Sequence, residues 1–266
     1  MAPVSIGIIT GSGAYSLPDL EGASTRTVQT RFGACELSVG EWQGVEVAHV
    51  SRHGTGHARL SSHVNHRANV LALRQHGVDA VFGVTICGAL EQTLELGSLV
   101  VFDDLYFLAN RLPDGSICSL YDQPGSPGRG HWVYERPFSE PLRRALLDGA
   151  DAAGLSAHDG GCYGHVDGPR FNTRTEIRML AGCGVRAVSQ TAGPETVLCG
   201  EAELPYALLG YVTDYANGVS ELPTPVSELT RLMGVSAGAF SATLAHALRR
   251  LPADPVAPVG IHIRWP

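Results

Sequence analysis

The 266-residue sequence predicts an α/β fold, a single domain (residues 1–266) with a mixed central β-sheet flanked by helices. Two observations lead to this prediction. Short apolar runs typical of buried strands alternate along the chain with stretches of helical spacing. In addition, no linker or internal repeat divides the chain, and a domain of this length can bury most of a central sheet without a metal or disulfide.

The predicted strands end next to polar or glycine-rich segments. In an open α/β sheet, ligands bind at the carboxyl ends of the strands. We therefore expect a ligand site at these segments. The predicted strands are residues 4–10, 45–51, 78–85, 98–103, 158–166, 187–189 and 207–213.

The predicted helices have apolar residues at helical spacing. The first of them, 64–76, stops at Gly77, a residue suited to a helix C-cap. Residues 109–130 are rich in Gly, Pro, Asp and Ser and are predicted as a surface excursion, and 252–266 as an irregular tail. The other predicted helices are 141–153, 173–181, 194–202 and 226–251.

Composition excludes several classes of function. The net charge is −7, there is no basic run, and all 19 basic residues are arginines. We therefore expect no nucleic-acid partner and no membrane partner, and neither Schiff-base lysine chemistry nor a P-loop is available. Six cysteines without a CxxC pair are typical of reduced thiols, which favours a cytoplasmic location.

Two polar segments follow the first predicted strands. Gly11-Ser12-Gly13 can turn backbone N–H groups toward an anion, although an ordinary turn is an equally good interpretation. Arg52 and His53 stand at a strand end and suit a phosphate or carboxylate, against the alternative of a surface salt bridge. Four histidines (His53, His57, His63, His66) could suggest zinc, but no carboxylate or cysteine falls among them, so we expect no metal.

Three later segments also place polar or aromatic side chains at strand ends. Phe171, in Gly168-Pro169-Arg170-Phe171, can offer a ring face to a flat base or can be core, and Arg170 can pair with Glu176. Gln190 and Thr191 stand at a strand-to-helix junction. Asp214 ends an apolar strand, where a partly dry carboxyl can act as an acid; a solvated or helix-capping Asp is the alternative.

Taken together, these segments resemble the methylthioadenosine phosphorylase branch of the trimeric purine nucleoside phosphorylases. The resemblance covers some four-fifths of the chain, and the segments recur in the order of that family. They are GIITGSG (7–13), SRHGTGH (51–57), HVNHRANVLAL (63–73), VTICGAL (84–90), DGPRFNTRTE (167–176), SQTAGPETVLCGE (189–201) and VTDY (212–215).

The resemblance implies a role for each matching position. Phosphate, the co-substrate, is held by Ser12, Arg52, His53, Thr85 and Thr191. The purine and sugar are lined by Ile86, Cys87, Gly88 and Phe171, while Asp214 bonds the purine and acts as the catalytic acid. His131 approaches the nucleoside 5′ group across a homotrimer interface. The partners implied are a purine nucleoside and phosphate, with no cofactor and no metal.

Four positions depart from the family pattern. Gln190 replaces a methionine that packs on the ribose, and Ala216 replaces a second Asp that helps to bind a 6-amino group. His66 replaces an aromatic residue, and Asp167 a Glu. The implied activity is phosphorolysis or synthesis of a purine nucleoside, most of all 5′-methylthioadenosine or a related 5′-modified adenine nucleoside. The alternatives are a 6-oxopurine nucleoside or nucleoside analogue, hydrolysis of the same bond, and a binding protein with a decayed site.

Overall fold

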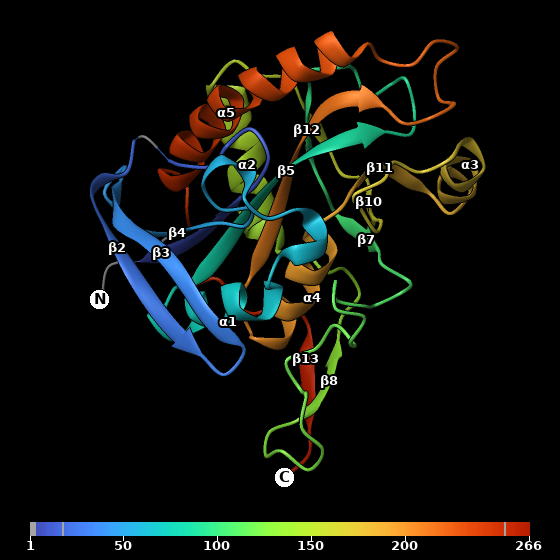
Figure 1. Cartoon of the computed structure of the whole chain (residues 1–266). Coiled ribbons are helices and arrows are strands. Elements are labelled where there is room, and N and C mark those ends of the chain that lie inside the picture. The colour runs from blue at the N-terminus through green and yellow to red at the C-terminus, as the bar shows by residue number, and fades with distance from the viewer. Residues whose placement is uncertain (1–3, 18, 253) are drawn as a thin grey trace.

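The computed structural model describes residues 4–17, 19–252 and 254–266. Within these residues, eleven strands form one mixed sheet and two further strands form a separate pair. Figure 1 shows the sheet crossing the molecule with helices on both of its faces. The prediction of an α/β fold with a mixed central sheet is confirmed.

The main path of the sheet runs β2-β3-β4-β1-β5-β11-β10-β7, and β12, β6 and β9 continue from β5. Strands β2, β3 and β4 are antiparallel, whereas β4, β1, β5 and β12 are parallel. The strands are β1 (Ser5–Thr10), β2 (Glu21–Thr30), β3 (Gly33–Trp42), β4 (Val45–Ser51), β5 (Ala80–Ala89), β6 (Leu99–Val101), β7 (Asp104–Tyr106), β9 (Ala157–Asp159), β10 (Cys162–His165), β11 (Val185–Ser189) and β12 (Tyr206–Tyr215).

The helices cover the sheet in two pairs. Helices α2 and α5 pack together on one face, and α1 and α4 pack together on the other. Gly77 caps α1 in the left-handed conformation, as predicted. The helices are α1 (His66–His76), α2 (Glu140–Ala152), α3 (Arg174–Gly182), α4 (Ala192–Glu201) and α5 (Val226–Leu248), with short 3-10 turns at Thr55–His57 and Ser61–His63.

Each face of the sheet has its own apolar core because side chains alternate along a strand. In β1, Ile9 packs toward α1 and α4, whereas Ile6 and Ile8 pack toward α2 and α5. The central strands are buried on both faces, which explains why they are continuous apolar runs and were recognisable in the sequence.

One edge of β5 is unpaired over a short stretch in the described part of the chain. Strand β1 pairs with β5 as far as Gly83, and β11 pairs with it from Gly88, while β12 follows its other edge. Residues 84–87 of β5 therefore face the space where β1 and β11 diverge. Such a divergence is where open α/β sheets bind ligands.

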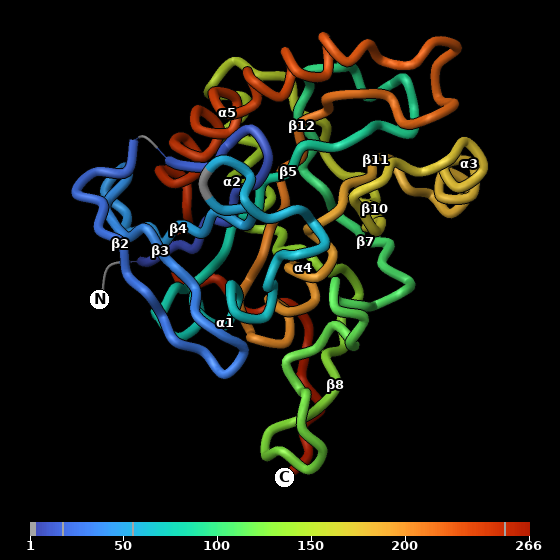
Figure 2. The backbone as a smooth tube through the Cα atoms, viewed as in Figure 1, coloured from blue at the N-terminus to red at the C-terminus, as the bar shows by residue number. Residues whose placement is uncertain are grey.

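Three predictions about the elements were wrong or incomplete. The run 158–166 is two strands, β9 and β10, because Gly160 and Gly161 have positive φ between them. The tail is not wholly irregular: β13 (Ile261–Arg264) pairs with β8 (Gly130–Val133) and projects from the body, as the backbone trace shows (Figure 2). The β2–β3 hairpin was not predicted, since β2 is exposed on both faces and lacks alternation.

Candidate active site

One pocket, with a cavity volume of about 290 Å³, collects the ends of β1, β4, β5, β11 and β12 at the gap in the sheet. It is lined by every residue that the sequence placed in a phosphate or nucleoside site except His131. These residues are Ser12, Arg52, His53, Thr85, Ile86, Cys87, Gly88, Phe171, Gln190, Thr191, Asp214 and Ala216.

Arg52 lies at one end of this pocket, and its side chain is only 1% exposed. Its Nε and Nη2 each donate to a carboxylate oxygen of Glu195 at 2.7 Å, and its Nη1 donates to the carbonyl of Val84 at 2.8 Å. The bidentate face of the guanidinium therefore holds Glu195 in place of an external anion. Of its five N–H groups, one Nη1 hydrogen remains once a weaker bond to Ile9 O is counted.

Glu195 makes this arrangement possible, because two buried charges must compensate each other. Burial lowers the pKa of Arg52, but the charge and hydrogen bonds of Glu195 outweigh burial and keep that pKa above its ordinary value. Burial likewise raises the pKa of Glu195, and Arg52 reverses this, leaving it below its ordinary value. Tyr206 adds a hydrogen bond of 3.3 Å to Glu195. These directions favour the ionised pair, which two hydrogen bonds join.

His53 lies beside Arg52 and is neutral near pH 7. Burial, then the charge of Arg52, lowers the pKa of its imidazole to about 4. Its Nδ1 donates to the carbonyl of Arg59 at 2.8 Å, which leaves Nε2 without a proton as an acceptor. His57 also lines the pocket and stacks on His53, with ring centroids 4.2 Å apart. Tyr15 contacts Nδ1 of His57 through its hydroxyl at 3.0 Å.

Hydroxyl groups and a helix end complete this part of the pocket. The hydroxyls of Thr85 and Ser189 lie 2.8 Å apart, joining β5 to β11 across the gap. Thr191 is the buried N-cap residue of α4, so the positive end of the α4 dipole faces the same space. Ser12 lies in a turn that Ala14 N closes on Gly11 O. Neutral donors and a helix end of this kind suit an oxyanion.

Asp214 lies within β12 and pairs with Gly88 of β5, further along that strand than Val84, the acceptor of Arg52, so the two charged groups lie at different ends of the pocket. The helix-capping interpretation is therefore wrong, and the residue is half-buried. Burial raises the pKa of its carboxyl above the ordinary value, against a hydrogen bond of 2.9 Å from Thr213 that lowers it. A Cβ at Gly88 would approach Asp214 Oδ2 to 3.0 Å, so a glycine there leaves room for the carboxyl. Asp214 is placed to hold or release a proton.

The segment 167–173 forms a rim beside Asp214. Phe171 lines the pocket and is 61% exposed, so it is not core. Arg170 forms two hydrogen bonds, 2.9 and 2.7 Å, with Glu176, which confirms the expected ion pair. Glu176 also caps the first turn of α3 together with Thr173. These contacts leave the ring of Phe171 free to cover a flat ligand.

The two pocket residues that depart from the family pattern differ in surroundings. Gln190 is hydrogen-bonded on both sides of its amide, to Ser61 and to the Arg170 carbonyl. Ala216 is buried among apolar side chains that include Ile177 and Val188. The base end of the pocket therefore contains one carboxyl, that of Asp214, and an apolar wall in place of a second.

The structure places His131 outside this pocket. It lies on β8, with its ring edge-on to Trp265 at a centroid distance of 5.2 Å, and it lines a separate cavity of about 610 Å³ together with Tyr134. This cavity and the active-site pocket share no lining residue among those that the structure describes, and Figure 1 shows β8 and β13 projecting from the body of the molecule. Its expected role across a subunit interface stays a prediction.

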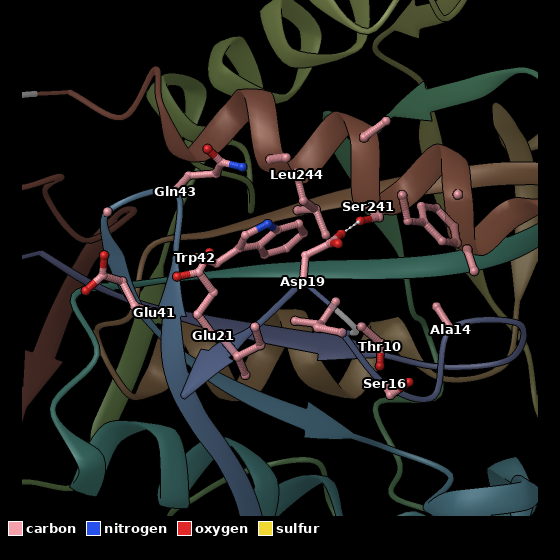
Figure 3. A pocket seen from close by; sticks show the side chains of 18 residues that line it. Thr10, Ala14, Ser16, Asp19, Glu21, Glu41, Trp42, Gln43, Ser241 and Leu244 are labelled. Atoms are coloured by element: carbon pink, nitrogen blue, oxygen red, sulfur yellow. Dashed lines mark hydrogen bonds between the residues drawn. The ribbon is translucent and has the colours of Figure 1, made fainter. Parts of the chain in front are cut away.

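A larger hollow, about 1070 Å³, lies elsewhere, between α5, the segment after β1 and the β3–β4 turn. Figure 3 shows Asp19 bonded to Ser241 on α5, with Trp42 beside them; the Asp19–Ser241 distance is 2.6 Å. None of the residues that the sequence singled out for phosphate or nucleoside lines this hollow. Size alone therefore does not identify the active site.

Some features of the site were not expected from the sequence. Glu195 was not predicted as the buried partner of Arg52. An acidic residue inside an otherwise apolar helix was the available signal, since such a charge needs a buried partner. No three His, Cys, Asp or Glu side chains gather to hold a metal ion in the described part of the chain. Lining residues to which no role was assigned from the sequence include Ser61, Asn172, Asn217, Leu229 and Met233.

Comparison with known proteins agrees with this geometry. The Phosphorylase superfamily matches residues 5–249. The 6-oxopurine nucleoside phosphorylase of Pyrococcus furiosus is 34% identical over 232 residues, 86% of each chain. The S-methyl-5′-thioadenosine phosphorylase of Thermofilum pendens is 31% identical over 256 residues, 96% of this chain and 95% of the relative. The methylthioadenosine phosphorylase from Schistosoma mansoni, solved with adenine, superposes with a TM-score of 0.86 at 28% identity, covering 94% of this chain and 92% of that one.

The chain is thus a phosphorylase by fold and by sequence. It belongs to the Phosphorylase superfamily, as the match over most of its length shows. Within that family it is an enzyme of the group that contains the purine nucleoside and methylthioadenosine phosphorylases. No helix in the described residues is long and apolar enough to cross a membrane.

Proposed function

We propose that the protein cleaves the N-glycosidic bond of a purine nucleoside with inorganic phosphate, in a reversible reaction. One observation carries this proposal: a single pocket has anion donors at one end and a carboxyl with a raised pKa, Asp214, at the other. The reaction needs both, because phosphate must reach C1′ on one face while negative charge grows on the departing base.

At the phosphate end, each group has a definite part. Ser12, Thr85 and Thr191 supply hydroxyls, and α4 supplies its N-terminal dipole. Arg52 gives its remaining N–H and the fixed charge of its ion pair. Since Nε2 of His53 is an acceptor, it suits the P–OH of hydrogen phosphate better than a bare phosphate oxygen. No organic cofactor or metal takes part in this scheme.

At the base end, protonated Asp214 donates to the purine as the bond breaks, which is general acid catalysis. Its raised pKa keeps a larger share of the carboxyl protonated than in water. Phe171 covers the base, and Ile86, Cys87 and Gly88 of β5 form the floor beneath base and sugar. In this scheme, Asp214 alone transfers a proton to the purine.

For the substrate, we propose 5′-methylthioadenosine or a related 5′-modified adenine nucleoside. Apolar Leu229 and Met233 from α5 line the pocket and suit an apolar 5′ substituent. A 6-oxopurine nucleoside is a second candidate, favoured by Ala216, which removes an acceptor for a 6-amino group. The relatives quoted above include enzymes named for both substrate types.

The test is a substrate panel assayed for base release with and without phosphate. The panel contains 5′-methylthioadenosine, 5′-methylthioinosine, adenosine and inosine. We expect release that saturates with phosphate and yields a sugar 1-phosphate. Release that is independent of phosphate would identify a hydrolase, and binding without any turnover at high phosphate would identify a decayed site.

We further propose a homotrimer in the cytoplasm. Exposed apolar side chains surround His131, including Val133, Ile263 and Trp265, and an exposed patch of this kind supports association. All six cysteines are free thiols, which supports a reducing compartment. Sedimentation equilibrium measures the mass directly, and a His131→Ala variant tests whether His131 completes a neighbouring site.

A further inference from the structure

Gln190 occupies an unusual position between two segments that border the pocket. It follows β11 directly, and its side-chain amide lies between the 3-10 turn at Ser61 and the segment 167–173. Ser61 Oγ donates to Gln190 Oε1 at 3.0 Å, and Gln190 Nε2 donates to the carbonyl of Arg170 at 3.1 Å. The amide thus joins three parts of the chain that are distant in sequence.

The packing around this amide is close. A Cβ at Gly168 would overlap Gln190 Oε1 and lie 2.5 Å from Ser61 Oγ. Gly168 therefore allows the backbone of segment 167–173 to lie directly against the amide. A methionine at this position would offer neither a donor for the Arg170 carbonyl nor a strong acceptor for Ser61.

The carbonyl that accepts from Gln190 belongs to Arg170, the residue directly before Phe171. The carbonyl after it, that of Phe171 itself, accepts from Arg170 Nη1 at 3.2 Å, and Arg170 is in turn fixed by Glu176. On the other side, Asn217 Nδ2 donates to the carbonyl of Asn172 at 2.7 Å. Since the ring of Phe171 is 61% exposed, its position depends on these backbone bonds and not on core packing.

We propose that Gln190 is a positioning residue that fixes segment 167–173 and thereby holds Phe171 over the pocket. It acts on binding of the purine through Phe171, in addition to any contact with the sugar. The consequence for the reaction rests on the proposed function, whereas the effect on the segment does not. The two parts are therefore tested separately.

The first test needs no substrate. Hydrogen–deuterium exchange of the full chain is measured for wild type, Gln190→Met and Gln75→Met, the last being an exposed glutamine on α1 outside the pocket. We expect faster exchange in residues 167–173 for Q190M alone, because the hydrogen bond from the Gln190 amide to the Arg170 carbonyl of this segment is lost. Unchanged exchange in Q190M overturns the proposal, whether or not the protein is a phosphorylase.

The second test uses 5′-methylthioadenosine, or whichever nucleoside of the panel is turned over, in a double-mutant cycle. Q190M is expected to raise the KM for the nucleoside about five- to tenfold while the KM for phosphate stays within about twofold, as loss of one or two hydrogen bonds predicts. In a Phe171→Ala background, Q190M should have almost no further effect, because the two residues act as a unit. An equal effect in both backgrounds overturns the action through Phe171.

Two further variants separate the two bonds of the amide. Gln190→Glu keeps the acceptor for Ser61 but sets an oxygen against the Arg170 carbonyl. The exchange of residues 167–173 and the KM for the nucleoside should therefore rise at least as much as in Q190M. Ser61→Ala removes only the other bond and should have the smaller effect. The reverse order would contradict the assignment of the Arg170 carbonyl as the controlling contact. Absence of turnover in the wild type would reject the proposed function and leave the exchange result to decide the role of Gln190.

Discussion

The two ends of the pocket differ in how fully their polar groups are bonded within the protein. At the phosphate end, Arg52 is held by Glu195 and by backbone carbonyls, and both charges are buried. At the base end, Asp214 has one hydrogen bond, from Thr213, and Ala216 adds an apolar wall. The first end is a fixed framework for an anion, whereas at the second end a single side chain can change which base fits.

The largest expected effect on activity concerns the base end. Asp214→Asn keeps the shape of the side chain but removes the titratable proton. We expect kcat with 5′-methylthioadenosine to fall about 10²–10⁴-fold, the usual contribution of a positioned acid. The KM for phosphate should change little, because Asp214 lies beside Gly88 of β5, whereas Arg52 contacts Val84 earlier in that strand. Steady-state kinetics at saturating phosphate measures this, and an unchanged kcat would exclude Asp214 as the acid.

The largest expected effect on stability concerns the phosphate end. Glu195→Ala leaves the buried guanidinium of Arg52 without its counter-charge, which should lower the free energy of unfolding by about 3–5 kcal/mol. Denaturant unfolding measures the loss. Glu228→Ala is the matched control, since it breaks an exposed ion pair with Arg231 on α5 and should cost less than about 1 kcal/mol. Equal losses in the two variants would contradict the framework role of Glu195.

A smaller effect is expected from introducing a second carboxyl at the base end. Ala216→Asp should raise the ratio of kcat/KM for adenosine over inosine about tenfold, since a hydrogen bond to a charged group is worth that much. It should also destabilise the fold, because Ala216 is buried among apolar residues. Ala216→Asn is the control for size without charge. If both variants shift the ratio equally, shape and not charge selects the base.

The same difference between the two ends explains what the sequence could predict. Central strands such as β1 and β12 are continuous apolar runs, so their positions and the polar groups at their ends were predictable. The Arg52–Glu195 pair was not, because it joins residues 143 positions apart and depends on how α4 is placed against β4. The bonds of Gln190 likewise depend on three segments meeting in space. Residue types mark a site, whereas long-range packing decides what each side chain contacts.

The smallest expected effect comes from a change in the pKa of Asp214 that leaves the Asp214 side chain itself in place. Thr213 donates to Asp214 Oδ1 and thereby lowers a pKa that burial raises. Thr213→Val removes this donor, so the pKa should rise further and the protonated acid should persist to higher pH. The alkaline limb of the pH profile of kcat/KM should therefore move to higher pH.

A shift of the alkaline limb between wild type and T213V reports on Asp214, because the ionisation of phosphate is common to both and the neighbouring thiol does not titrate in the same range. Burial, and then the charge of Asp214, raises the pKa of Cys87 well above its ordinary value. The control is Thr230→Val, an exposed threonine on α5 whose hydroxyl bonds only the carbonyl of Val226 in the described structure. A limb that moves to lower pH in T213V, or that moves equally in T230V, would mean that another group supplies the proton at the base end.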